Sequence, residues 1–477
     1  MKARLLNAGY HMYSDIWSDQ PPLLAHILAL AHLCFGDSLI VARLCVCGFG
    51  AILVLSICFA VAYLEGPVES AALLLVLCAS PTLVSLSSAA TLAVPAYALA
   101  AMAIALNTLD SENRWPVVLF VSSLVMAMAA LIKLSALIAI PAALVALAFG
   151  RASNGTRPRR LARSMTWLVL TAMIYMLGML LLGGNVVEIS SHHWSSKIAQ
   201  QFPLAASRGQ LLGALSGDLH VCLLAVVAVG FGLVHRGTMI PTVWLATALG
   251  VHWFHTPFWH HHYLHVFIPL AWLAGIGCVK MVTGLFAFCT KSGPVALRTC
   301  VVALMLVVCL SICLTKVMSI KGRMQSSFSK VFGFNVDRDI VSALKQLTQD
   351  GDIVYSDFVG YAILADRLVP PEVAVASRKR IANSGNFDLT LQSACNHFKP
   401  KALVLWPPMH GDEFMRFVND NYVAIAMTND IGFRLFALSA ASKLGRASQR
   451  HFPPTEYSNE VPSPGTPHTN LSCEKEH

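Results

Sequence analysis

The chain has 477 residues, of which 56% are hydrophobic and only 12% are charged. Soluble domains carry about 25% charged residues, so this composition excludes an ordinary soluble protein and is typical of an integral membrane protein. The formal charge of +9 at pH 7 comes from 34 basic and 25 acidic residues. Much of this excess lies in one basic loop and in the C-terminal third, which argues against a nucleic-acid partner.

Residues 1–36 are predicted to form an outer-face loop with a short amphipathic helix. The stretch "YSDIWSDQPP" places Asp15 and Asp19 directly before two prolines. One interpretation is a solvated turn, because Ser, Asp, Gln and Pro are common loop formers. The other is a catalytic or substrate-binding loop at the membrane face. The apolar stretch that follows is too short to cross a membrane comfortably.

Residues 37–316 are predicted to form a transmembrane bundle of about ten spans. Several segments are shorter than the ~20 residues that a perpendicular helix needs. Some contain prolines, which neighbouring helices can accommodate. The apolar segments are 37–63, 68–84, 90–108, 116–130, 132–149, 165–183, 219–236, 240–254, 263–285 and 295–316.

A basic loop sets the predicted orientation. The stretch "RASNGTRPRRLARS", residues 151–164, is the strongest cationic cluster beside a span, so we expect it in the cytoplasm. Threading the chain from there places the acidic loop, the loop 184–218, the turn "FHTPFWHHHYLH" and everything after residue 316 on the outer face. Three polar features then share a side with the C-terminal region, which favours the substrate-binding interpretation of the acidic loop.

Residues 317–439 are predicted to form a small extracytoplasmic α/β domain. A helix, the strand "DIVYS" and a second helix come first. The strand "KPKALVLWP", the helix "GDEFMRFVNDNY" and the strands "VAIAMT" and "FRLFAL" follow. Alternating helices and strands indicate an α/β fold. Residues 440–477 have too little apolar surface to order themselves and are predicted to be a disordered tail.

Two cations interrupt apolar sequence. Lys133, in "ALIKLSALIAIP", lies near the predicted outer end of a span. An ionisable group at such a position is costly and indicates a functional site. A lysine that extends its ammonium to the interface is an equally good interpretation. Arg43 lies just inside an apolar segment and could bind an anionic lipid headgroup.

Histidines gather in the turn before the ninth apolar segment. An interfacial belt of amphipathic side chains is one interpretation, and hydrogen bonding to a phosphate or sugar is another. A metal site is disfavoured, because no acid or thiolate lies nearby and adjacent histidines rarely converge on one ion. His192 and His193 lie in the longest outer loop. The histidines of the turn are His252, His255, His260, His261, His262 and His265.

Motifs of other enzyme classes are absent from the sequence. There is no Walker motif, no G-x-S-x-G elbow, no H-E-x-x-H and no G-x-G-x-x-G after a strand. Nothing therefore indicates an ATPase, a hydrolase or a dehydrogenase.

The segment "GYHMYSDIWSDQPPLLAHILALAHLCFGDSLIVARL" resembles the first outer loop of the GT-C membrane glycosyltransferases. It is most similar to the protein-mannosyltransferase-like, Rgt-type and aminoarabinose-transferase-like group. "LIKLSALIAIP" is similar to the lysine-containing step of these proteins, and "HTPFWHHHYLH" to their His-x-Pro turn. The resemblance runs from residue 9 to about residue 438. The matching residues are Gly9, Tyr10, Tyr13, Asp15, Asp19, Gln20, Pro21, Pro22, Leu23, Phe35, Gly36, Ala42, Arg43, Lys133, Pro141, His255, Pro257, His262 and Tyr263.

This resemblance implies transfer of a sugar from a polyprenyl-phosphate donor to a lipid, glycan or protein acceptor. The site would face the outer side of a bacterial inner membrane. No metal ligand is assigned, although a divalent cation is a candidate cofactor because some members use one. The candidate catalytic residues are Asp15 and Asp19, and the candidates for binding the donor phosphate or substrate are Lys133, Arg43, His255, His262, Tyr263 and His192.

Two departures from the family pattern keep alternatives open. Members normally begin with a span whose outer end carries an acid, upstream of the position of Gly9, and a second acid is expected within residues 87–100. The sequence shows neither, so either the start codon is assigned too late or the chain is a divergent copy. A catalytically inactive or truncated GT-C-like scaffold is one alternative. A transporter of a lipid-linked sugar is the other, although no paired internal repeat supports it.

Overall fold

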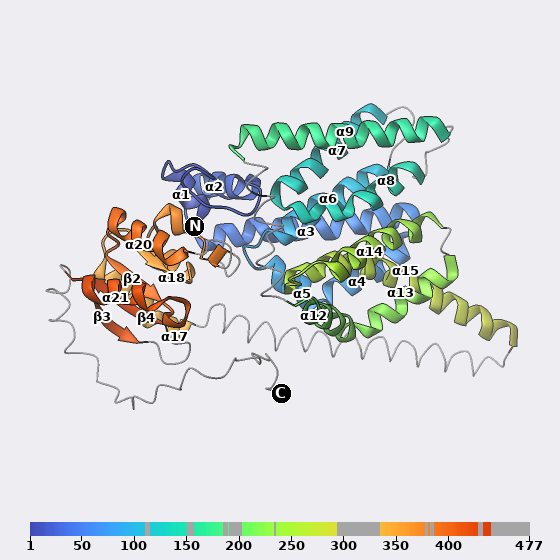
Figure 1. Ribbon diagram of the computed structural model, residues 1–477. Helices are drawn as coiled ribbons and strands as arrows, with labels where there is room; N and C mark the ends of the chain where they lie inside the picture. The colour runs from blue at the N-terminus through green and yellow to red at the C-terminus, as the bar shows by residue number, and fades with distance from the viewer. Residues whose placement is uncertain are drawn as a thin grey trace.

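The computed structural model describes residues 1–109, 115–149, 157–184, 189, 203–232, 235–292, 334–376, 380–381, 386–427 and 433–439. A helical bundle is joined to a small α/β domain, which confirms the predicted fold class (Figure 1). The helices α1 (Lys2–Asn7) and α2 (Leu23–Phe35) lie between the domain and the bundle. The apolar segment 295–316 and the predicted tail lie outside the described residues.

The helices of the bundle follow the apolar segments of the sequence. An additional helix, α12, occupies part of the segment 184–218, which was predicted to be a loop. Its sequence "LAASRGQLLGALSG" mixes Ser, Gly and Gln with leucines and carries no clear apolar stripe. The elements are α3 (Leu39–Leu64), α4 (Pro67–Cys78), α5 (Pro81–Ser87), α6 (Ala93–Thr108), α7 (Trp115–Ile132), η1 (Leu134–Ala139), α8 (Ile140–Phe149), α9 (Arg157–Leu181), α12 (Leu204–Gly217), α13 (Leu219–Gly232), α14 (Arg236–Phe254), η2 (His260–His262) and α15 (Tyr263–Ser292).

Several of these helices can cross a membrane. Among the described residues, three are long and apolar enough: Leu39–Leu64, Pro158–Leu181 and His260–Ala287. Two bent pairs raise that number to five, α4 with α5 at 72° and α12 with α13 at 82°. The first bend comes at Pro81, where Ser80 caps the new helix by accepting a hydrogen bond from the Leu83 N–H.

Helix α6 lies at the centre of the bundle. Its sequence "AVPAYALAAMAIALNT" is buried on nearly every side, as expected of a helix that is apolar all round. It packs on α3 and α7, and its small alanines allow close approach. Helix α9 lies at one edge of the bundle and α12 at the opposite edge (Figure 1). The position of α6 matters because its first turns carry part of the candidate site.

Helices α13 and α15 meet at a glycine. A Cβ atom on Gly277 would lie 1.9 Å from the carbonyl oxygen of Leu224, which belongs to the backbone and cannot rotate away. The close approach of these two helices therefore requires glycine at this position.

We expect Gly277→Ala to destabilise the bundle by about 1–3 kcal/mol, because the added methyl forces α13 and α15 apart. The matched control is Gly250→Ala in α14, where an added Cβ meets nothing within 4 Å. That control gains helix propensity and should be neutral or slightly stabilising. Thermal unfolding of the two variants in detergent checks the prediction, and equal melting temperatures would contradict it.

The C-terminal domain contains a four-stranded sheet in the order β1-β2-β4-β3. Strands β1 and β2 are parallel, whereas β4 is antiparallel to both of its neighbours. Helix α20 was not predicted. The elements are α17 (Phe334–Leu347), β1 (Val354–Ser356), α18 (Gly360–Ala365), η3 (Pro371–Val373), α20 (Phe387–Phe398), β2 (Ala402–Leu405), η4 (Pro407–Met409), α21 (Asp412–Asn421), β3 (Tyr422–Met427) and β4 (Arg434–Leu438).

A buried histidine ties three segments of this domain together. The Nδ1 atom of His410 lies 2.7 Å from Asp388, and its Nε2 atom lies 2.9 Å from Asp357. Both aspartates also accept backbone hydrogen bonds, from Gly411 and Trp406. Burial disfavours the charged imidazole, but the hydrogen bonds to the two carboxylates outweigh burial and raise the pKa of His410 to about 9.

We expect His410→Gln to lower the free energy of unfolding by about 3 kcal/mol at neutral or mildly acidic pH. The folded-state pKa is raised, so this stabilisation is complete below the ordinary pKa of 6.5 and is lost as the pH rises through about 9. Melting temperatures measured across this range should converge at the alkaline end. The exposed His397→Gln serves as the control, and a penalty that did not depend on pH would contradict the assignment.

Candidate functional site

The candidate site forms around Lys133, where a helix is interrupted. Helix α7 ends at Ile132 and η1 begins at Leu134, so Lys133 lies between them in an extended conformation. Its side chain is only 6% exposed, and its ammonium has no hydrogen-bond partner among the described residues. A buried charge without such a partner is costly, and this indicates a place prepared for a ligand.

Tyr97 of α6 forms the floor of this site. The Lys133 ammonium lies 5.9 Å from the centre of the Tyr97 ring, at the outer limit of a cation–π contact. The Tyr97 hydroxyl lies 3.1 Å from the Ser135 hydroxyl and also hydrogen bonds with Nε2 of His265. Tyr97 therefore connects α6, η1 and α15, and fixes the elements on which the site is built.

Imidazole rings form the wall of the site. His252, at the end of α14, stacks on His262 at a centroid distance of 5.2 Å and lies 5.0 Å from His265. Both ring nitrogens of His252 are buried without a hydrogen-bond partner in the described part of the chain. His262 accepts a hydrogen bond at Nδ1 from the Trp259 N–H. This bond leaves the proton on Nε2 and the ring neutral.

The acidic loop supplies a carboxylate to the same place. Asp19 lies within electrostatic range of Lys133, as do His252, His261, His262 and His265. These residues come from segments more than 100 positions apart in the chain. We call the group formed by Lys133, Tyr97, His252, His261, His262 and His265 the lysine–histidine cluster, with Asp19 at its edge.

The other predicted site residues lie outside the lysine–histidine cluster or contact only one of its members. The carboxylate of Asp15 accepts the His11 N–H and closes its own turn. Arg43 is half-buried in the second turn of α3. His255 approaches the cluster through His262, at 6.2 Å between ring centres.

Tyr263 donates a hydrogen bond to Asp218 over 2.9 Å. Asp218 lies between α12 and α13, so the Tyr263 hydroxyl is hydrogen-bonded to the residue that joins these two helices. The predicted role of Tyr263 in substrate binding stays a prediction, and His192 lies outside the described residues.

No metal site is built into the described part of the chain. Within those residues, no three His, Cys, Asp or Glu side chains are arranged to hold an ion. Asp19 is the acid in electrostatic range of Lys133, whereas divalent cations such as Mg²⁺ and Ca²⁺ require several oxygen ligands. The described residues of the cluster therefore do not fit a divalent cation.

Part of the chain matches a known family model. Residues 19–181 match the model of the dolichyl-phosphate-mannose-protein mannosyltransferases. This range includes Asp19 and Lys133. No curated protein matches the chain significantly.

Solved structures extend the likeness to nearly the whole chain. ArnT from Cupriavidus metallidurans in the apo state is 15% identical, with a TM-score of 0.58, over 92% of each chain. ArnT bound to undecaprenyl phosphate is 14% identical, with a TM-score of 0.57, over 92% of each chain. The chain has the GT-C glycosyltransferase fold. The Archaeoglobus fulgidus oligosaccharyltransferase tethered with an acceptor peptide is 11% identical, with a TM-score of 0.53, over 92% of this chain and 69% of the other.

Tyr97 was not among the residues that the sequence singled out. It stands between alanines in the segment 87–100, where the family pattern predicts an acid. A phenol in an otherwise aliphatic helix is a usable signal, because a buried hydroxyl needs a partner. The sequence indicated His252 and His265 only as two of the histidines in the histidine-rich turn.

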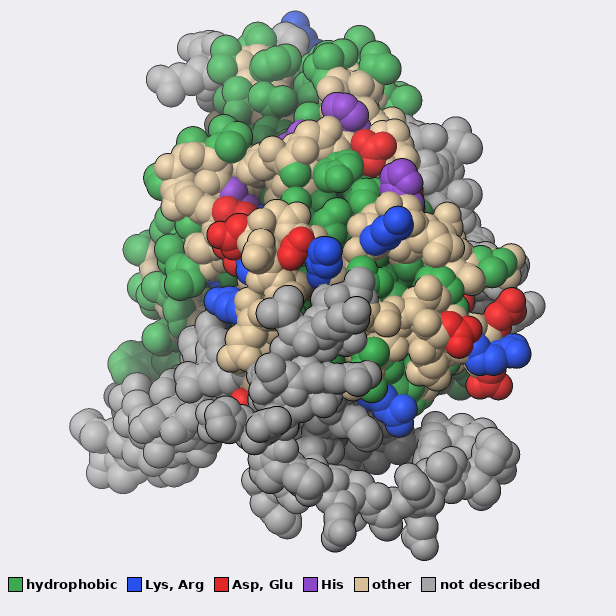
Figure 2. Space-filling view, turned by 90° about the vertical axis from the view of Figure 1, so that its left-hand side faces the viewer, with side chains coloured by type: hydrophobic (Ala, Val, Ile, Leu, Met, Phe, Trp, Pro, Cys, Tyr) green, Lys and Arg blue, Asp and Glu red, His purple; other side chains and the backbone are tan. Residues whose placement is uncertain are grey.

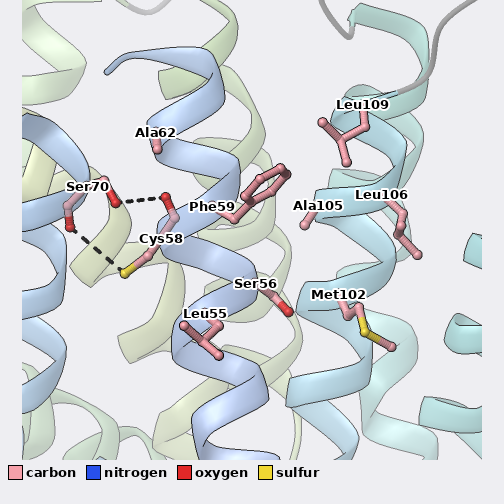
Figure 3. Close-up of a pocket in the computed structure, with 10 residues that line it drawn as sticks. All are labelled: Leu55, Ser56, Cys58, Phe59, Ala62, Ser70, Met102, Ala105, Leu106 and Leu109. Carbon is pink, nitrogen blue, oxygen red and sulfur yellow. Dashed lines mark hydrogen bonds between the residues drawn. The ribbon is translucent and has the colours of Figure 1, made fainter. Parts of the chain in front are cut away.

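An apolar groove on the side of the GT-C bundle lies apart from the cluster. It has a volume of about 530 Å³ and lies between the second halves of α3 and α6 (Figure 3). Leu55 and Phe59 line it and are exposed. No charged residue lines it. Its lining residues are Leu55, Ser56, Cys58, Phe59, Ala62, Ser70, Met102, Ala105, Leu106 and Leu109.

Proposed function

We propose that this protein is a membrane glycosyltransferase that moves a sugar from a polyprenyl-phosphate donor to an acceptor. The observation that carries the proposal is the buried ammonium of Lys133 without a hydrogen-bond partner in the described part of the chain. An anionic ligand would supply that partner. The likeness to ArnT bound to undecaprenyl phosphate supports a lipid-linked phosphate as the anion.

The leaving group of such a donor is a phosphate, and the cluster suits it. When the bond between the sugar C1 and the phosphate oxygen breaks, negative charge develops on the phosphate. The Lys133 ammonium would stabilise this charge, and a neutral imidazole such as His262 would donate its Nε2–H. Such prearranged donors act strongly in a buried site because water does not screen them.

The acceptor requires a base, and Asp19 is our candidate. The acceptor hydroxyl or amine attacks the sugar C1, and its proton passes to the Asp19 carboxylate. The side chain of Asp19 is half-buried and lies within electrostatic range of Lys133 and Lys2.

We propose that the protein lies in a bacterial inner membrane with its C-terminal domain on the outer side. The basic stretch 151–164 follows α8, and the end of α8 lies at the end of the bundle away from the domain (Figure 1). Charged side chains gather at the end that carries the domain (Figure 2). The positive-inside rule places the basic end in the cytoplasm.

We expect Lys133→Met to lower sugar transfer by about 100-fold or more, since removal of one charge-stabilising donor costs roughly that much. The melting temperature should stay the same or rise, because an unpaired buried charge is removed. Lys280→Met in α15 is the control for loss of a half-buried lysine.

Ligand binding separates this role from a structural one. Added undecaprenyl phosphate should raise the melting temperature of the wild type and of Lys280→Met, but not of Lys133→Met. Undecaprenol, which lacks the phosphate, should raise none of them. Equal stabilisation of wild type and Lys133→Met by the phosphate lipid would exclude Lys133 as the phosphate ligand.

The orientation is tested by labelling introduced cysteines in a variant whose native cysteines are replaced. An impermeant maleimide added to intact cells should label Glu413→Cys in α21 but not Arg159→Cys in α9, both of which are exposed positions. After the membrane is permeabilised, both should react. The reverse pattern in intact cells would invert the proposed topology.

A further inference from the structure

The N-terminal segment shares a hydrophobic core with the C-terminal domain. Leu5, Met12 and Ile16 are buried in one cluster with Ile340, Leu344 and other residues of the domain. More than 300 residues separate these partners in the sequence. The acidic loop is therefore attached to the domain as well as to the bundle that follows it.

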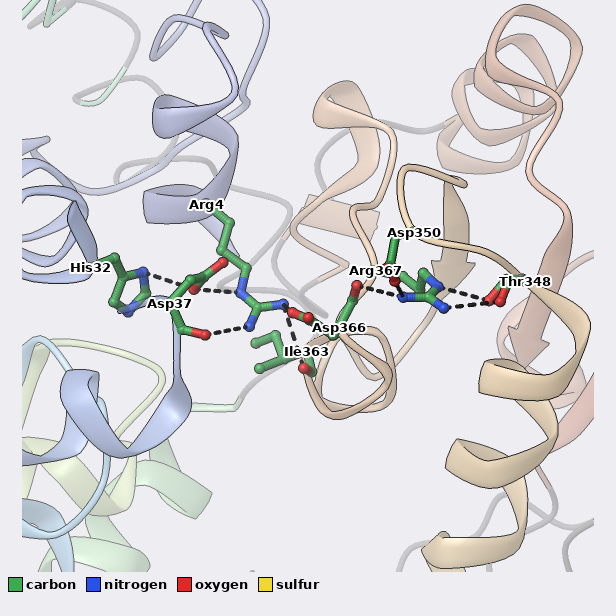
Figure 4. Close-up of polar contacts among 8 residues, drawn as sticks. All are labelled: Arg4, His32, Asp37, Thr348, Asp350, Ile363, Asp366 and Arg367. Atoms are coloured by element: carbon green, nitrogen blue, oxygen red, sulfur yellow. Dashed lines mark hydrogen bonds and ion pairs between the residues drawn. The ribbon is translucent and has the colours of Figure 1, made fainter. Parts of the chain in front are cut away.

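Arg4 ties α1 to both sides of this junction. It is 7% exposed and contacts Asp37, just before α3, at 2.8 Å, and Asp366, at the end of α18, at 3.1 Å. Arg367 restrains the turn at Asp366. It donates a hydrogen bond to the Asp366 carbonyl, and its guanidinium forms an ion pair with the Asp350 carboxylate at 2.8 Å. Figure 4 shows these contacts running from α1 across the junction into the domain. Arg4 thus fixes the base of the loop.

Arg380 holds the tip of the loop. Its guanidinium lies 4.9 Å from the centre of the Trp17 ring and 5.3 Å from that of Phe387. It also donates to the carbonyls of Glu372 and Val375, so it is fixed within the domain. A planar guanidinium against an indole is a favourable and directional contact, worth about 0.5–2 kcal/mol.

Trp17 lies between the two loop aspartates, next to a polar anchor. The Lys2 ammonium donates to the Ser18 hydroxyl over 2.7 Å, and that hydroxyl donates to the Gln20 carbonyl over 2.8 Å. Residues on both sides of Asp19 are thereby restrained. Contacts with the C-terminal domain therefore determine the position of the loop. In this position Asp19 lies within electrostatic range of Lys133.

We propose that Arg380 is a positioning residue that acts through Trp17 to hold the loop that carries Asp19 at the candidate site. The C-terminal domain then helps to position the residues of the candidate site. The expected effect on activity rests on the proposed function, whereas the restraint on the loop can be measured without an activity assay. A displacement of about 1 Å at a reacting group can cost about 100-fold in rate, so a modest loosening of the loop has a measurable effect.

The first test substitutes the loop side of the contact, which leaves the hydrogen bonds of Arg380 intact. We expect Trp17→Leu to lower kcat about tenfold while KM for the donor changes less than about twofold. Trp17→Phe keeps an aromatic face and should retain kcat within about threefold. Arg380→Met should lower kcat at least as much as Trp17→Leu, because it also removes the hydrogen bonds to the Glu372 and Val375 carbonyls. The double variant should be no worse than Arg380→Met, because the contact with the loop is already lost in that variant. Arg416→Met, an exposed arginine of the same domain, is the control.

The second test is hydrogen exchange in the full-length protein, which requires no activity. Amides of residues 13–20 include Tyr13 and Ile16, whose N–H groups are hydrogen-bonded. They should exchange about tenfold faster in Trp17→Leu, whereas residues 129–136 should be unchanged. If exchange rises but the wild type transfers no sugar, the proposed function fails and the positioning role stands. If transfer occurs but exchange and kcat are unaffected by Trp17→Leu, the positioning role is overturned.

Discussion

A positive charge buried at a break between two helices constrains the candidate site of this protein. Lys133 stands between α7 and η1 with its ammonium removed from water and without a hydrogen-bond partner in the described part of the chain. Such a group costs several kcal/mol unless something compensates it. The ring face of Tyr97 and the charge of Asp19 offset part of this cost. In the described part of the chain, the ammonium and both ring nitrogens of His252 lack hydrogen-bond partners, and we propose that a ligand supplies them.

The residues of the candidate site come from three parts of the fold. Tyr97 and Lys133 lie on or between packed helices of the bundle, and the histidines come from the turn between α14 and α15. Asp19 comes from a loop whose position is determined by the C-terminal domain. Catalytic groups on rigid elements keep their geometry without further support, whereas a group on a loop needs a second set of contacts. The contacts of Arg4, Lys2 and Arg380 are that second set.

The sequence predicted the fold class well because long apolar runs indicate membrane helices, and short apolar runs between helical segments indicate the strands of the small domain. It also singled out Lys133, Asp19 and the histidine-rich turn, since charges and imidazoles are conspicuous in apolar surroundings. It could not show that Asp19 rather than Asp15 approaches Lys133, because both lie in one short loop and only the fold determines which carboxylate closes the turn with His11. The contact of Arg380 with Trp17 joins residues more than 350 positions apart and leaves no local pattern in the sequence. The sequence did not predict helices α12 and α20, because α12 carries no clear apolar stripe and α20 is a short helix that mixes polar and apolar residues.

The measurement that bears most directly on this account is a structure of the full-length protein in a lipid bilayer with undecaprenyl phosphate bound. The account predicts the phosphate within about 3 Å of the Lys133 Nζ atom, the distance of a charge-assisted hydrogen bond, and facing the rings of His252 and His262. A phosphate bound elsewhere, with Lys133 still lacking a hydrogen-bond partner, would contradict it.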